Sequence, residues 1–204
     1  MTTSNKFQHI YLKRCFLILY VLLLFSCVEN TDTIQLAKMS DEERWLSEIC
    51  SSKYKGRRAG TIECDEVADY ICQELNGMGY EVFSQPFILD DSLYLKNVFV
   101  VFKGISDSLI VVGAHYDGAV YGNAYSAADD NGSGVVALLS ICKALSESKI
   151  QNNKSILLAF WVAEESTHKK VFNGSRYFIT HFNDKDKILY YCNLDCFAHK
   201  EQGV

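Results

Sequence analysis

The feature that most constrains the fold is a series of three apolar runs, each followed by residues that can bind a metal ion. The runs are LIVVGA within 108–114, SILLAFWVA at 155–163 and ILYYCNL at 188–194. Runs that are apolar without alternation are typical of strands covered on both faces of a sheet. The β-branched and aromatic content of residues 80–89 and 95–102 predicts two more strands.

Helices are predicted between and before these strands. Apolar residues recur at helical spacing over 40–50, 64–78, 131–146 and 174–182. Strands that alternate with helices predict an α/β fold, in which a mostly parallel mixed sheet has helices packed on its faces.

The N-terminal segment is typical of a secretory signal rather than of a folded domain. Lys6, Lys13 and Arg14 precede an apolar run at 15–25, which is too short for a comfortable membrane span. The run ends in Leu-Phe-Ser-Cys, which resembles the bacterial lipobox, so we expect Cys27 to be lipidated. The alternatives are a plain signal anchor and a cleaved signal in which this cysteine is incidental.

This segment sets the expected organisation and location of the chain. We predict a lipoprotein signal peptide at 1–26, a short tether at 27–39 and one peptidase domain at 40–204 that is incomplete at its C-terminus. The protein would be exported and anchored by its lipid to a bacterial cell membrane, on the periplasmic or cell-surface side.

The net charge bears on nucleic-acid binding, and the cysteine spacing bears on disulfides. Removing residues 1–26 removes three cations and no acid, so the formal charge changes from −5 to −8. Because basic patches dominate affinity for nucleic acids, we expect no nucleic-acid partner. The six cysteines beyond Cys27 include no C-x-x-C pair, and buried free thiols are expected rather than a disulfide framework.

The first candidate ligands follow the first apolar run. A neutral imidazole nitrogen of His115 can bind zinc, and Asp117 would lie on the same side of an extended chain, where it could accept the other ring N–H. The segment 128–134 enters a predicted helix, and a carboxylate there could bridge two ions. Both segments also have an interpretation without a metal. His115 could simply be hydrogen-bonded to a neighbouring carboxylate, and the acids of 128–134 could form an ordinary N-cap of the helix.

The other candidates follow the second and third runs. Glu164 and Glu165 come directly after 155–163, and Asp195 ends the run at 188–194. Each could also belong to a solvated acidic loop. However, ligands of open α/β sheets bind just beyond the carboxyl ends of the strands. One histidine and several carboxylates at successive strand ends form a set that suits zinc without a thiolate.

These segments resemble the co-catalytic zinc exopeptidases of peptidase clan MH, which include bacterial leucyl aminopeptidases, glutamate carboxypeptidase and the transferrin receptor ectodomain. The resemblance rests on GAHYDG, SAADDNGSG, WVAEES and NLD, in this order, and on the loop GRRAGT before a helix. It covers about Tyr54 to Ala198. The implied fold is a three-layer sandwich with helices on both faces of a mostly parallel mixed sheet.

The resemblance implies a site for two zinc ions. His115 and Asp195 would bind one ion, Glu165 would bind the other, and Asp129 would bridge them.

It also implies an activity on peptides. The chain would be an aminopeptidase that removes N-terminal residues by means of a hydroxide bound by the two zinc ions. Glu164 would be the general base, and Asp117 would be the partner of His115.

Two departures from the family pattern bear on these expectations. The segment 166–173 is longer than expected before the Gly-Ser pair at 174–175. The family's last zinc ligand is a histidine far downstream, whereas this sequence ends at Val204 and His199 lies too close to Asp195 to replace it. We therefore expect the second zinc site to lack a ligand, a hydrophobic sheet edge to be exposed, and this chain alone to express poorly or be inactive.

Two other functions remain open. Glutaminyl cyclases share the fold and use a single zinc ion, and zinc stoichiometry would separate them from the peptidases. A truncated or non-catalytic homologue, such as a binding module, is the second alternative.

Overall fold

The computed structural model describes residues 39–89, 92–119, 126–165 and 174–196. The described residues belong to one compact unit, Ile34–Val204. The helices are α2 (Met39–Ile49), α3 (Ile62–Gly77), α4 (Gly134–Glu147) and α5 (Gly174–His181), with short helical turns at Ser52–Tyr54, Ala128–Ser133 and Lys185–Lys187. The strands are β1 (Phe83–Leu89), β2 (Leu93–Phe102), β3 (Ser106–His115), β4 (Lys154–Trp161) and β5 (Ile188–Asn193).

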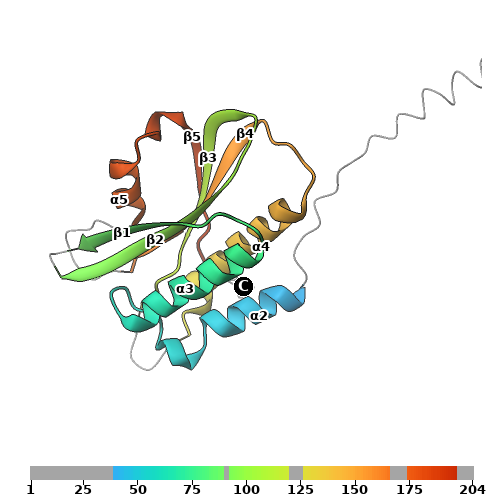
Figure 1. The fold of residues 1–204 in the computed structure, drawn as a ribbon. Helices are drawn as coiled ribbons and strands as arrows, with labels where there is room; N and C mark the ends of the chain where they lie inside the picture. The colour runs from blue at the N-terminus through green and yellow to red at the C-terminus, as the bar shows by residue number, and fades with distance from the viewer. Residues whose placement is uncertain (1–38, 90–91, 120–125, 166–173, 197–204) are drawn as a thin grey trace, which may run out of the picture. The chain divides into compact units, whose positions relative to one another are not determined.

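The five strands form one mixed sheet in the order β1-β2-β4-β3-β5 (Figure 1). The β1–β2 and β2–β4 pairs are antiparallel, whereas β3 pairs in parallel with both β4 and β5. Opposite His115, at the end of β3, lies Trp161, at the end of β4. The carboxyl ends of β3, β4 and β5 therefore meet at one edge of the sheet, as the sequence predicted.

Helices cover both faces of the sheet, which confirms the three-layer α/β fold. On one side, α2, α3 and α4 pack over a cluster that includes Leu158 and Phe160 of β4. On the other side, α5 inserts Phe178 against Leu157 and Trp161 of the same strand. Because successive strand residues point to opposite faces, the continuous apolar run of β4 supplies both cores.

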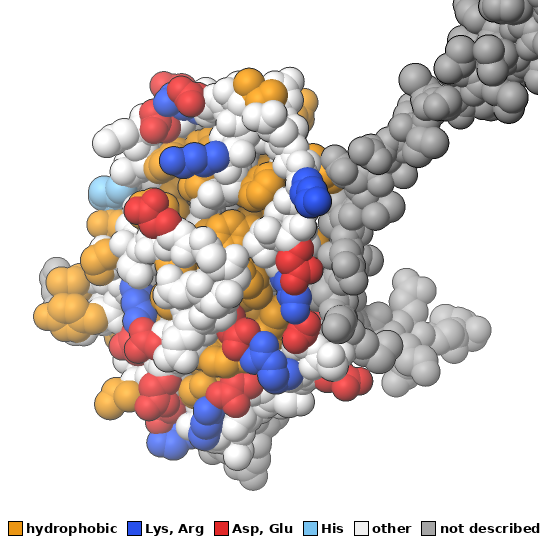
Figure 2. Space-filling view, turned by 45° about the vertical axis from the view of Figure 1, so that its right-hand side comes forward, with side chains coloured by type: hydrophobic (Ala, Val, Ile, Leu, Met, Phe, Trp, Pro, Cys, Tyr) orange, Lys and Arg blue, Asp and Glu red, His pale blue; other side chains and the backbone are white. Residues whose placement is uncertain are grey.

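Polar contacts attach α2 to the helices beside it. The Arg44 guanidinium donates to both Glu74 carboxylate oxygens, at 2.6 and 2.7 Å, and the Trp45 indole N–H donates to the same carboxylate at 2.7 Å. Lys143 of α4 pairs with Asp41 at 2.6 Å. Figure 2 shows acidic and basic side chains interspersed in this way over the face that it presents. None of the helices in the described ranges combines the length and apolar character that a membrane span requires.

The third apolar run differs from its prediction as a buried strand. Leu189, Tyr190 and Tyr191 of β5 are 48%, 68% and 52% exposed. The reason is that, among the described strands, β5 lies at the edge of the sheet and pairs with β3 alone. The described cysteines are free, and Cys192 and Cys196, which were expected to be buried, are exposed because they lie in and just beyond this edge strand.

Candidate metal centre

The candidate ligands converge at the carboxyl edge of the parallel strands. His115 is the last residue of β3, Glu164 and Glu165 follow β4, and Asp195 follows β5. Asp130 comes from the turn Ala128–Ser133, which leads into α4. The groups of potential ligand atoms within 4.8 Å of one another, among the described residues, are His115 with Asp130 and Asp195, and His115 with Glu164 and Glu165.

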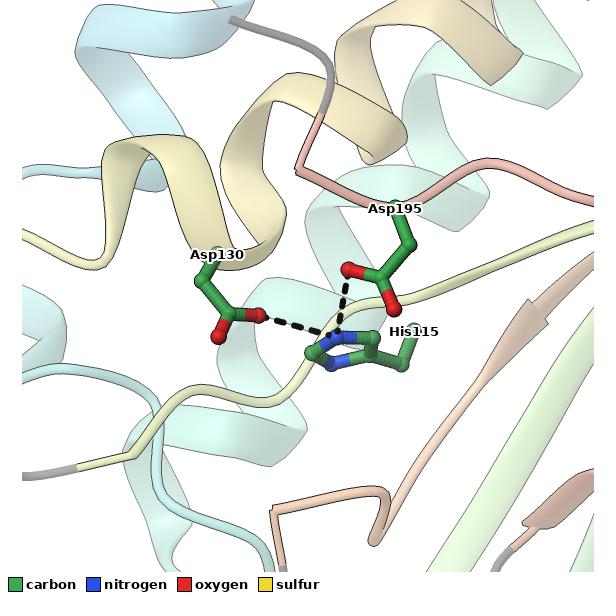
Figure 3. A group of neighbouring side chains, drawn as sticks. All are labelled: His115, Asp130 and Asp195. Carbon is green, nitrogen blue, oxygen red and sulfur yellow. Dashed lines mark ion pairs between the residues drawn. The ribbon is translucent and has the colours of Figure 1, made fainter. Parts of the chain in front are cut away.

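His115 is at the centre of this arrangement (Figure 3). Its Nε2 atom lies 3.2 Å from Asp130 Oδ1 and 3.6 Å from Asp195 Oδ1. His115 is 2% exposed, and its Nε2 atom is the one buried side-chain nitrogen or oxygen in the described ranges that makes no hydrogen bond. A buried nitrogen without a hydrogen bond that faces two carboxylates has the position of a metal ligand.

The carboxylate that approaches His115 belongs to Asp130 rather than to Asp129, for which we predicted the bridging role. In the described structure, the ligand groups contain Asp130 and not Asp129. Backbone angles explain the difference: Asp130 (φ −108°, ψ 95°) and Asn131 (φ −128°, ψ 44°) leave the helical conformation. The sequence pattern alone offers two adjacent acids with equal chemistry.

Asn131, which the sequence analysis did not single out, ties this turn to the strand that precedes Asp195. Its buried amide donates to the carbonyl of Leu194 at 2.8 Å, and its side-chain oxygen accepts from the amide of Gly134 at 3.0 Å. A Cβ on Gly134 would lie only 2.2 Å from that oxygen. Asn131 and Gly134 therefore fix the turn that carries Asp130 against the end of β5.

Asp117 contacts both His115 and the glutamate pair, but with different groups. His115 Nδ1 lies 3.1 Å from the backbone oxygen of Asp117 and 3.6 Å from its carboxylate. The carboxylate accepts instead from the amides of Glu164 and Glu165, at 3.2 and 3.1 Å. His115 Nδ1 thus lies nearer to the main-chain oxygen of Asp117 than to its carboxylate, and the carboxylate orients the glutamate pair.

The electrostatics of the cluster favour a bound cation. Burial lowers the pKa of His115, but hydrogen bonding with Asp117 and the charges of Asp117, Glu164 and Asp195 outweigh it and raise this pKa to about 9. Burial raises the pKa of Glu164. Burial, followed by hydrogen bonding with Asp130 and its charge, raises the pKa of Glu165 to about 7. A divalent cation would offset the same repulsion that protons offset here.

The donor set therefore fits zinc. One imidazole nitrogen and several carboxylate oxygens are ligands that zinc accepts, with no thiolate required. A hollow of about 230 Å³ adjoins them, and its lining residues come from the ends of β3, β4 and β5 and from the start of α5, among them His115, Glu164, Ser175 and Asn193.

Some predicted residues fall outside the described ranges. Cys27, His199 and the segment 166–173 are among them.

The helix after that segment begins at Gly174, which packs closely on β2 and β4. The buried side chain of Asn97 donates to the carbonyl of Gly174 at 2.9 Å, and its oxygen lies 3.4 Å from the amide nitrogen of Val162.

Substitution of Gly174 tests how closely the start of α5 must pack against β2 and β4. A Cβ there would lie 2.0 Å from Asn97 Oδ1 and 2.7 Å from the carbonyl of Val162. We expect Gly174→Ala to destabilise the protein by about 1–3 kcal/mol, because either the helix or the strand must shift. Gly77→Ala is the matched control: nothing lies within 4 Å of the added Cβ, so alanine should raise helix stability by up to about 1 kcal/mol. Urea unfolding of both variants measures the effect, and equal stabilities would contradict it.

The fold and the ligand set together define an α/β protein that can hold a divalent cation beyond its parallel strands. Residues 97–204 match the profile of Peptidase family M28, which is more than half of the chain. The chain belongs to this family, and the predicted relationship is confirmed.

Individual relatives agree with this assignment. The chain is 26% identical over 172 residues to leupeptin-inactivating enzyme 1 of Streptomyces exfoliatus (83% of this chain, 38% of the relative). It is 31% identical over 94 residues to leucine aminopeptidase 2 of Trichophyton rubrum (45% of this chain, 17% of the relative). The chain thus spans less than half the length of these curated relatives.

Solved structures share the fold. A Zn-dependent exopeptidase from Parabacteroides distasonis aligns with a TM-score of 0.67 at 20% identity, over 82% of this chain and 64% of that one. A glutaminyl cyclase from Porphyromonas gingivalis aligns with a TM-score of 0.65 at 20% identity, over 78% of this chain and 59% of that one. At this identity the two structures establish the architecture and leave the reaction open.

Proposed function

We propose that this chain carries the metal centre of a zinc-dependent exopeptidase, and specifically of an aminopeptidase that acts on peptides. The observation that carries the proposal is the buried Nε2 atom of His115, which makes no hydrogen bond and faces the carboxylates of Asp130 and Asp195. Membership in family M28 and relatives named as leucine aminopeptidases support the same class.

The proposed site would hold two ions that share one carboxylate ligand. His115 and Asp195 would hold the first ion and Glu165 the second. Asp130 is the best candidate for the shared ligand, because it lies 3.2 Å from His115 Nε2 and is also hydrogen-bonded to Glu165. Bound zinc would polarise a water molecule and the scissile carbonyl.

Glu164 is the proposed proton carrier. It lies at the end of β4 beside His115 and is exposed, so its carboxylate can reach a substrate. The carboxylate of Asp117 holds the backbone amide of Glu164, which limits the positions that this side chain can take. Glu164 would accept a proton from the attacking water and deliver it to the leaving amine.

Elemental analysis and a peptidase assay on the same preparation test this proposal. Two zinc ions per chain, with hydrolysis of aminoacyl p-nitroanilides, would support the aminopeptidase. One zinc ion, with cyclisation of N-terminal glutamine, would support the glutaminyl cyclase alternative, which the similarity in fold to such enzymes keeps open. Zinc bound without turnover of either substrate would identify a non-catalytic homologue.

The raised pKa values predict how zinc binding depends on pH. Without metal, the pKa is about 9 for His115 and about 7 for Glu165, so both groups are largely protonated at pH 6. Zinc binds the deprotonated forms, so its apparent affinity should rise by about tenfold per pH unit for each proton displaced.

Competition with a chelating dye between pH 6 and 9 measures this rise. In Glu165→Gln the additional rise below pH 7 should disappear, while the rise that His115 causes up to about pH 9 remains. An affinity independent of pH over this range would show that these groups do not bind the ion.

A further inference from the structure

The loop after the turn Ser52–Tyr54 places a buried arginine against the backbone of the segments that carry the candidate ligands. Arg57 is fully buried, and it has a left-handed backbone conformation, with φ 47°. In the described ranges no carboxylate forms an ion pair with it. Its guanidinium donates to the carbonyl oxygens of Ile49, Tyr116, Ser126 and Ala127 and is also hydrogen-bonded to the Cys50 thiol. Its neighbour Arg58 is exposed.

The guanidinium joins two segments that carry the proposed ligands. Its Nε atom donates to the carbonyl of Tyr116, between His115 and Asp117, at 2.8 Å. Its Nη1 atom donates to the carbonyl of Ser126 at 3.0 Å, and Nη2 donates to that of Ala127 at 2.5 Å.

The main chain of the same loop adds to the connection. The carbonyl of Arg57 accepts from the amide of Gly118 at 3.3 Å. The carbonyl of Ala127, which receives Nη2, also accepts from the amide of Gly132 at 3.1 Å. Arg57 is therefore linked on one side to the residues around His115 and on the other to both ends of the turn that carries Asp130.

An arginine suits this position better than a lysine. Its planar head directs five N–H donors along fixed directions, whereas an ammonium group is a point charge on a flexible stem. A buried cation is costly unless it is hydrogen-bonded and lies near an opposite charge. Burial lowers the pKa of Arg57, and the charge of the nearby Asp117 carboxylate offsets part of this effect by favouring the charged form.

We propose that Arg57 is a positioning residue, whose guanidinium fixes the spacing between the His115 segment and the Asp130 turn and thereby sets the affinity of the metal centre. This inference rests on the proposed metal function. It adds that the binding geometry depends on a loop that contributes no ligand.

The variant Arg57→Lys tests the proposal, with Arg58→Lys as the matched control in the same loop. We expect the zinc affinity of the full chain, measured by competition with a chelating dye, to fall by about 10–100-fold in Arg57→Lys, as for loss of other residues that orient ligands. The d–d absorption of bound cobalt should also change, because the angle between the ligands changes. Arg58→Lys should retain the affinity and the spectrum of the original chain.

The outcomes separate this proposal from the proposed function. If the original chain binds no zinc, the metal function fails and the inference fails with it. If the original chain binds zinc and Arg57→Lys has a lower melting temperature but the same zinc affinity and cobalt spectrum, Arg57 is only structural and the positioning role alone is overturned.

Hydrogen exchange of the unsubstituted chain gives a test that does not require a folded variant. Zinc should slow exchange of the amides of Arg57, Gly118 and Gly132 together, since hydrogen bonds connect them. Protection around residues 115–118 and 128–133 without protection at 54–58 would show that the loop is not coupled to the metal centre, and would overturn the proposal.

Discussion

Glu164→Gln is expected to lower kcat for aminoacyl p-nitroanilides by about 10²–10⁴-fold, which is the usual contribution of a positioned acid–base group. The amide has nearly the same shape as the carboxylate but cannot accept the proton of the attacking water. Because Glu164 is not one of the proposed ligands, zinc content and affinity should change little. Glu81→Gln, which makes the same chemical change at an exposed position away from the site, should retain full activity.

The comparison of kcat with zinc content decides the role of Glu164. If the activity of Glu164→Gln stays within about fivefold of the original, another group carries the proton. If the activity and the bound zinc are lost together, Glu164 acts as a ligand, and the roles assigned within the glutamate pair must be exchanged.

Asp130→Asn is expected to weaken zinc binding by about 100-fold or more. This is at least the loss seen when residues that only orient ligands are removed, and Asp130 is proposed to contact both ions. Asparagine keeps the size of the side chain and removes its charge, so the turn should keep its shape. The adjacent substitution Asp129→Asn should change zinc affinity much less, because the carboxylate that lies 3.2 Å from His115 belongs to Asp130.

The two neighbouring substitutions show which acid is the shared ligand: the sequence motif predicted Asp129, and the structure favours Asp130. Chelator competition and zinc stoichiometry of both variants measure the difference. If Asp129→Asn loses the metal and Asp130→Asn retains it, the bridging role first predicted from the motif is correct, and the turn rearranges when zinc binds.

Much of the fold could be predicted because its signals are local. The apolar run of β4 supplies both cores of the sheet, and this is visible as nine residues without a charge. The start of α3 is also set locally, because the hydroxyl of Thr61, the residue before it, accepts a hydrogen bond from the amide of Cys64 at 3.3 Å. The exposure of β5 could not be read from its residues, because an apolar run appears the same in a central strand and at an edge.

Part of the site could also be predicted from the sequence. The residue types and the order of His115, the acidic turn, the glutamate pair and Asp195 indicated a metal centre, because ligand chemistry depends on side-chain type and on placement at strand ends.

The sequence by itself determined the α/β class, the edge of the sheet at which the site lies, and the kinds of ligand available, since these follow from periodicity and side-chain chemistry. Only the tertiary structure decided that Asp130 rather than Asp129 approaches His115, that the Asp117 carboxylate binds the glutamate amides, and that Arg57 lies behind the centre. The physical reason is that these choices depend on backbone angles within a turn and on contacts between segments up to 70 residues apart. No local pattern in the chain encodes either.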